Sequence, residues 1–122
     1  MTTTRRGFNT PYSGQNLDRI AFPLGGLGAG CFCLEGNGAL TKHSIRHKPE
    51  MDYEPRMFAS LGFSGAPASA RVIQGKVPDW KVFTGQGAGN GHRNKTYGLP
   101  RMTCRQFEAR FPFARLDMVH PH

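Results

Sequence analysis

The chain has 122 residues, 38% of them hydrophobic, and a formal net charge of +8 at pH 7. This length fits one domain with a modest core. Its 16 Gly and 9 Pro exclude long helices, because few windows of a dozen residues lack a residue that destabilises a helix interior. The composition indicates loop-rich β structure.

The excess of positive charge raises the question of nucleic acid or another anionic partner. The 16 Lys and Arg are scattered, however, and Arg5-Arg6 is the only adjacent basic pair. No recognition helix, zinc finger or RNA-binding aromatic motif accompanies them. We therefore expect no nucleic-acid partner. An anion or nucleic-acid binder remains an alternative, and it predicts a steeply salt-dependent affinity.

Residues 1–16 are polar and predict an extended N-terminal arm, followed by the folded region 17–122. Arg5-Arg6-Gly7-Phe8 resembles the opening of a twin-arginine export signal, but the apolar segment that such a signal needs is missing. No run approaches the ~18 apolar residues of a membrane span. We expect a cytoplasmic protein with no membrane span.

The next segment predicts a strand, a glycine loop and a hairpin. Leu17 to Phe22 predicts a short strand, and the glycines from 25 to 30 predict a loop that can adopt positive φ. Cys31 to Leu34 is a short apolar run typical of a buried strand. Gly36-Asn37-Gly38 predicts a tight reversal, after which a return strand begins at Ala39.

The glycine loop invites a nucleotide-binding interpretation, which its pattern does not support. The glycines are spaced G-G-x-G-x-G and precede a strand, whereas the dinucleotide motif is G-x-G-x-x-G before a helix. A phosphate loop would continue with Gly-Lys-Ser/Thr, and this one does not. We expect a structural loop that positions a neighbouring domain, and no cofactor.

Metal and disulfide sites are also not expected. Cys31 and Cys33 are two apart on a strand and point to one face, so they do not bridge each other. We expect these two residues and Cys104 to pack as small hydrophobic side chains, in a protein that resides in a reducing compartment. His43 and His47 lack the acidic neighbour of the H-E-x-x-H motif.

The polar segment 42–55 has two interpretations. Its densest part, 46–50, predicts either a solvated loop or a polar cluster that contacts a sugar or another domain. Beyond it, 56–63 and 68–73 predict strands, whereas 76–100 predicts a loop with a glycine-dense part at 85–91.

The last elements complete an all-β prediction. Segments 102–110 and 113–119 alternate apolar and polar residues, which predicts half-buried strands. Short strands between glycine turns favour an antiparallel β-sandwich. A final strand that ends near Val119 would leave an uncovered sheet edge, so we expect an incomplete sandwich.

An ordered set of motifs carries a family resemblance over about residues 17–117. These motifs are Ile20-Ala21-Phe22-Pro23-Leu24-Gly25-Gly26-Leu27-Gly28-Ala29-Gly30, Leu34-Glu35-Gly36-Asn37-Gly38-Ala39-Leu40, Arg46-His47-Lys48-Pro49, Gly98-Leu99-Pro100-Arg101 and Phe111-Pro112-Phe113-Ala114-Arg115-Leu116. Together they resemble the N-terminal domain of glycoside hydrolase family 116, the non-lysosomal glucosylceramidases and bacterial β-glucosidases.

The resemblance implies a β-sandwich that packs on a larger C-terminal (α/α) barrel and reaches glycoside substrate only through that barrel. Such enzymes are retaining glycosidases, in which two carboxylates ~5 Å apart flank the scissile bond. In the family both carboxylates belong to the barrel, and none of the eight acids here matches either catalytic motif. We therefore expect no catalytic residue and no activity from this chain alone, which should also be poorly soluble by itself.

Two sets of candidate site residues follow. The first is an interdomain or substrate-entrance loop formed by Gly25, Gly26, Gly28, Gly30, Arg46 and His47. The second belongs to the alternative, a stand-alone carbohydrate-binding module without catalysis, whose aromatic platforms would be Trp80, Tyr53 and Tyr97.

Overall fold

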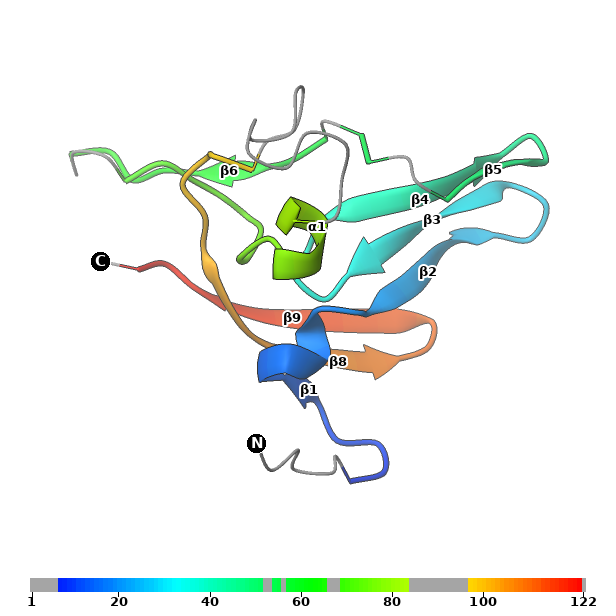
Figure 1. The fold of residues 1–122 in the computed structure, drawn as a ribbon, viewed down its shortest axis with the longest axis horizontal. Coiled ribbons are helices and arrows are strands. Elements are labelled where there is room, and N and C mark those ends of the chain that lie inside the picture. The colour runs from blue at the N-terminus through cyan, green and yellow to red at the C-terminus, as the bar shows by residue number, and fades with distance from the viewer. Residues whose placement is uncertain (1–6, 52–53, 56, 66–68, 84–96, 122) are drawn as a thin grey trace.

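The computed structural model describes residues 7–51, 54–55, 57–65, 69–83 and 97–121, and the statements below concern these residues. The fold is all-β with antiparallel sheets in a sandwich-like arrangement, as the sequence predicted. Figure 1 shows the β8–β9 pair running beneath the sheet that contains β2, β3 and β4. A four-stranded, a three-stranded and a two-stranded sheet are present in this part of the chain.

The four-stranded sheet contains the predicted glycine segment and has the order β2-β3-β4-β5. Its strands are β2 (Ala21–Gly26), β3 (Gly30–Glu35), β4 (Leu40–Ile45) and β5 (Lys48–Glu50). The glycine loop is a turn at 27–29 that joins β2 to β3, and Gly28 has a φ of +74°. The strand at 31–34, the reversal at 36–38 and the return strand are confirmed.

The polar segment 42–55, predicted as either a solvated loop or a polar contact cluster, contains strand structure, because residues 42–45 belong to β4 and residues 48–50 form β5. A β-bulge near Lys42, whose φ is +54°, shifts the register between β3 and β4. Arg46 and His47 form a two-residue turn with φ of +54° and +59°, the geometry of a type I′ hairpin. The turn lacks the Asn-Gly signal of that geometry, so the sequence did not reveal it.

The three-stranded sheet has the order β1-β8-β9. Its strands are β1 (Tyr12–Ser13), β8 (Thr103–Arg110) and β9 (Phe113–Val119). The two long strands confirm the predicted alternation. β1 comes from the segment predicted to be a polar arm, and a 3₁₀ helix, η1 (Gly14–Leu17), follows it. The strand predicted from Leu17 therefore begins only at Ala21, because η1 takes up the preceding residues.

The remaining elements are short. β6 (Ser60–Leu61) pairs with β7 (Arg71–Val72), each much shorter than the predicted strand. The loop predicted over 76–100 contains a one-turn helix, α1 (Asp79–Phe83), which follows Pro78 and has an acidic residue in its first turn. The predicted flexible part at 85–91 lies outside the described residues.

The core lies where the two larger sheets meet. Phe22 of β2 packs on Phe107 of β8, with ring centroids 6.1 Å apart, and Phe107 is fully buried. The 36–38 turn also reaches this interior, because a Cβ on Gly38 would lie 2.7 Å from Met118 Cε. The large apolar side chains that stay exposed are Phe8, Leu27, Ile45, Met51, Met57, Phe58, Leu61, Phe63, Ile73, Leu99, Phe111 and Phe113. The buried apolar core is therefore small.

Candidate functional site

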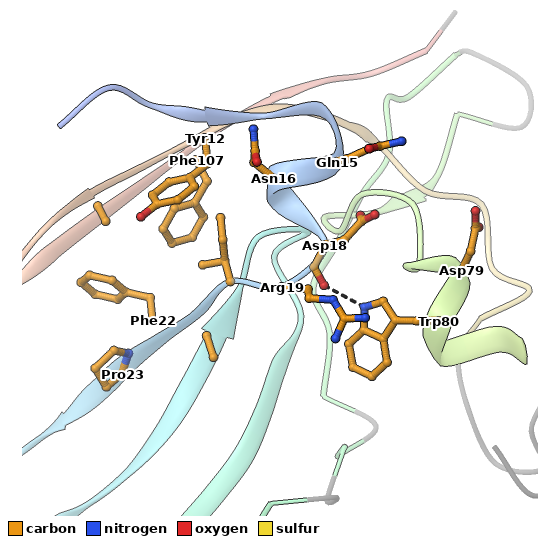
Figure 2. A pocket seen from close by; sticks show the side chains of 13 residues that line it. Tyr12, Gln15, Asn16, Asp18, Arg19, Phe22, Pro23, Asp79, Trp80 and Phe107 are labelled. Atoms are coloured by element: carbon orange, nitrogen blue, oxygen red, sulfur yellow. Dashed lines mark hydrogen bonds between the residues drawn. The ribbon is translucent and has the colours of Figure 1, made fainter. Parts of the chain in front are cut away.

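An open groove of about 780 Å³ lies beside Trp80, between η1, α1 and β8 (Figure 2). Its volume falls within the ~300–1,000 Å³ of small-molecule sites. Four separate parts of the sequence meet here: β1 with η1, the start of β2, α1, and β8.

One side of the groove is aromatic. Tyr12 packs edge-on against Phe107, with ring centroids 6.4 Å apart. This contact follows from the pairing of β1 with β8, which places the two residues opposite each other. Phe22 and Pro23 extend the apolar side along β2 (Figure 2).

The other side is polar. Gln15 and Asn16 are on η1 and are exposed, and Asp18 and Arg19 follow in the turn that leads to β2. No hydrogen bond engages the Gln15 or Asn16 side chain within the described part of the chain. These side chains supply amide, carboxylate and guanidinium groups that can bind a polar ligand.

Trp80 connects the groove to α1. Its Nε1–H donates a hydrogen bond to the Asp18 carbonyl oxygen at 2.8 Å, drawn in Figure 2. The Arg19 guanidinium carbon lies 5.4 Å from the centroid of the indole ring, which is a cation–π distance. Trp80 is therefore held in place by the segment before β2.

Behind Trp80, Lys81 is the centre of a buried ionic cluster. Its Nζ donates to Glu35 Oε2 at 2.6 Å and to Glu54 Oε1 at 3.1 Å. The Lys81 side chain is 8% exposed and that of Glu35 is 7% exposed. Thr41 Oγ1 donates to the second oxygen of Glu35 at 2.9 Å, and Tyr97 Oη donates to Glu54 Oε2 at 2.6 Å. Both carboxylates are thus hydrogen-bonded and share the single positive charge of Lys81.

The cluster changes the proton affinity of Tyr97. Burial raises the pKa of the Tyr97 hydroxyl, and its hydrogen bond to the Glu54 carboxylate raises that pKa further. Burial also lowers the pKa of Arg101, which donates to Gln74 Oε1 at 2.6 Å. The arrangement anchors α1 to the end of β3.

The structure separates the predicted aromatic candidates. Trp80 lines the groove, whereas the hydroxyl of Tyr97 belongs to the ionic cluster, and Tyr53 lies outside the described residues. Tyr97 therefore does not share a binding surface with Trp80.

The six loop candidates lie together at one end of the four-stranded sheet. Gly25 and Gly26 end β2, and Gly28 and Gly30 shape the turn at 27–29. A Cβ on Gly30 would lie 2.6 Å from the Ser44 carbonyl oxygen and 3.3 Å from Ile45 Cα. The 27–29 turn is therefore adjacent to the 46–47 turn, where Arg46 and His47 are exposed.

Sequence reasoning did not identify Gln15, Asn16 or the ionic cluster. The Gly-Gln-Asn run in η1 has turn-forming residues, which could have indicated that the predicted arm folds back. Lys81 is 46 residues from Glu35 and 27 from Glu54, and no local signal links groups so far apart.

Three further findings concern the described residues only. No group of three or more His, Cys, Asp or Glu that could hold a metal ion is found among them. None of their helices is long and apolar enough to cross a membrane. Cys31, Cys33 and Cys104 are free thiols, and burial raises the pKa of Cys33 and of Cys104.

Comparison of the chain with protein-family models, with curated proteins and with solved structures finds no match.

Proposed function

We propose that this chain is the N-terminal β-sandwich portion of a retaining β-glucosidase- or glucosylceramidase-like glycoside hydrolase, where it supports a catalytic (α/α) barrel. The ordered motifs of residues 17–117 support the family. The observation that supports the role is the large apolar surface that this fold leaves uncovered.

The uncovered surface can be quantified. Among the described residues, twelve large apolar side chains are 39% or more exposed, although side chains of this kind are normally buried. Part of the apolar surface is hollowed: a depression of about 360 Å³ is lined by Leu40, Met57, Phe58 and Ile73. We call these four residues the apolar hollow. Exposed apolar surface of this kind supports a contact with another domain.

The family resemblance assigns both catalytic carboxylates to the barrel, and two of the acids in this chain are already engaged in the fold. Lys81 bridges Glu35 and Glu54, so neither carboxylate is placed to attack or protonate a glycoside. The 122-residue chain should therefore show no glycosidase activity alone.

The first test is the size and activity of the native product. An antibody against this segment should capture a protein far larger than 13.5 kDa, and the captured protein should hydrolyse an aryl β-glucoside. NMR of the first-formed sugar should show the β anomer, because a retaining mechanism preserves configuration. A captured product of 13.5 kDa without glucosidase activity would contradict the proposal.

A matched pair of variants tests the apolar hollow in that native product. Phe58→Asp should lower the temperature at which activity is lost, because it places a charge in the interdomain contact. Phe113→Asp is the control, since Phe113 is 76% exposed and lies beside the β8–β9 turn, away from the hollow. Equal effects of the two variants would contradict an interdomain role for the hollow.

A second candidate function is carbohydrate binding in the Trp80 groove, and the observation that favours it is the pairing of aromatic and unengaged polar side chains. A sugar ring can pack its C–H face on Tyr12 or Trp80 while its hydroxyls bond to Gln15, Asn16 and Asp18. Such a site would bind a glucoside without cleaving it.

Titration calorimetry with β-glucosides tests this candidate. The double variant Gln15→Ala/Asn16→Ala should weaken binding at least tenfold, the loss expected when two or more hydrogen bonds of about 1 kcal/mol each are removed. Gln106→Ala, an exposed amide on β8, is the control and should bind as the parent does. The absence of heat with every glucoside would exclude the groove as a sugar site.

A further inference from the structure

The two adjacent turns at one end of the four-stranded sheet combine apolar and basic side chains. We define the basic tip as residues 27–29 and 45–48. Leu27 is fully exposed in the 27–29 turn, and Ile45, which precedes the neighbouring 46–47 turn, is 51% exposed. Arg46, His47 and Lys48 are exposed on the neighbouring turn. The basic tip contains no acidic residue.

These basic side chains are not used to hold the fold. No hydrogen bond or ion pair engages the side chains of Arg46, His47 or Lys48 within the described residues. The nearest acid along the chain, Glu50, lies opposite His43 across the β4–β5 pair. The positive charge at the tip is therefore available to a partner.

The two residues of the 46–47 turn are not those that its backbone geometry favours. Arg46 and His47 both adopt positive φ, a conformation that costs a residue with a Cβ about 1–2 kcal/mol. Asn-Gly would satisfy this turn with less strain. A strained turn made of a cation and an imidazole indicates a functional requirement for those side chains.

We propose that the basic tip docks on an anionic phospholipid surface, with Leu27 inserted at the boundary of headgroups and acyl chains. Each Lys or Arg near such a surface contributes about 1 kcal/mol, and a buried apolar side chain adds to this. The net charge of +8 attracts the chain to the same surface over a longer range. Charge complementarity and a protruding apolar side chain favour a membrane over a folded protein partner.

The lipid contact is independent of the interdomain contact proposed above. β4 runs from Leu40 in the apolar hollow to Ile45 in the basic tip, a distance of about 17 Å. One end of the strand can therefore contact another domain while the other end contacts lipid.

Co-sedimentation with vesicles tests the lipid contact. The 122-residue chain, carried on a soluble fusion partner, should sediment with vesicles of phosphatidylcholine and phosphatidylserine and not with phosphatidylcholine alone. Raising the salt from about 0.05 M to about 0.5 M should release it, because screening weakens exposed charge contacts. The fusion partner alone should stay in the supernatant.

Three variants locate the contact. Arg46→Asn/His47→Gly removes the basic side chains but supplies the residues that a type I′ turn prefers, so the fold should persist and the partition coefficient should fall about fivefold, the loss expected for one cation near the surface. Leu27→Ser should also reduce the partition coefficient. Phe113→Ser removes an exposed apolar side chain of β9, outside the basic tip, and should leave the partition coefficient unchanged.

Two results would overturn the proposal. One is equal binding of the parent and of Arg46→Asn/His47→Gly to anionic vesicles. The other is the absence of vesicle binding, including the case in which the chain binds an anionic polymer such as heparin or RNA instead.

Discussion

Lys81 and Glu35 form a buried ion pair with 2.6 Å between Nζ and Oε2, although they are 46 residues apart in the sequence. Glu35 ends β3, and Lys81 lies on α1 next to Trp80. The pair therefore fixes the helix that presents Trp80 to the groove.

Removing the cation should strongly destabilise the fold. Lys81→Met would leave Glu35 buried without its partner, a change that typically costs about 3–5 kcal/mol. Urea denaturation should show a large drop in the unfolding midpoint, and Lys81→Met/Glu35→Gln should recover part of it. Lys76→Met is the control, because Lys76 pairs with Asp79 on the surface. Equal midpoints for Lys81→Met and Lys76→Met would disprove a structural role for the buried pair.

The two glycines that flank the 27–29 turn should differ in their tolerance of a side chain. Gly30 has a φ of +85°, and its Cβ would lie 2.6 Å from the Ser44 carbonyl oxygen. We expect Gly30→Ala to cost about 1–3 kcal/mol. A Cβ on Gly26 would meet only Ala29 Cβ at 3.5 Å, so Gly26→Ala should be mild. Thermal melts of the two variants compare these costs directly, and a reversed order would show that the turn adopts another conformation.

Stability should fall at alkaline pH because of Tyr97. Burial and the hydrogen bond to Glu54 raise the pKa of Tyr97, which is about 10 in an unfolded chain. The folded state therefore favours the neutral phenol, so this contribution is complete below about pH 10 and is lost as the pH rises toward the raised pKa. Urea denaturation between about pH 8 and pH 11 should show a steeper loss for the parent than for Tyr97→Phe. Parallel curves would contradict the assignment.

Cys104 should be a slow nucleophile in the folded chain. Burial raises the pKa of its thiol, the Asp117 carboxylate raises it further, and Sγ lies 3.2 Å from the Gly36 carbonyl oxygen. Because the thiolate is the reactive form, alkylation by iodoacetamide at about pH 8 should be slower in the native chain than in urea. Peptide mass spectrometry can follow this site separately from Cys31 and Cys33. Equal rates in the two states would show that Cys104 is not protected.

The elements that could be predicted from the sequence are those whose signal lies in neighbouring residues. Alternation revealed β8 and β9, and Gly36-Asn37-Gly38 revealed the central hairpin, because the strand period and turn chemistry are properties of neighbouring residues. The Arg46-His47 turn was missed because tertiary pairing imposes a conformation that these residues do not favour locally.

Prediction of the site was limited for a similar reason. Trp80 was named as a possible sugar contact, but its neighbours Gln15 and Asn16 come from a segment that reads as a polar arm. The pairing of β1 with β8 and the hydrogen bond from Trp80 to the Asp18 carbonyl place them beside the tryptophan. The helix α1 spans five residues, too few to show a helical period.

The turn at 36–38 has a consequence for engineering this chain. Gly36 and Asn37 are buried, which is unusual for residues of a hairpin turn, and the Asn37 carbonyl accepts a hydrogen bond from the Gly75 amide at 2.6 Å. A peptide tag or fluorophore inserted there would have to pass between the sheets. The exposed turn at 46–47 can instead accept an insertion without entering the interior. Of the two hairpins in this sheet, the one at 46–47 therefore tolerates an insertion and the one at 36–38 does not.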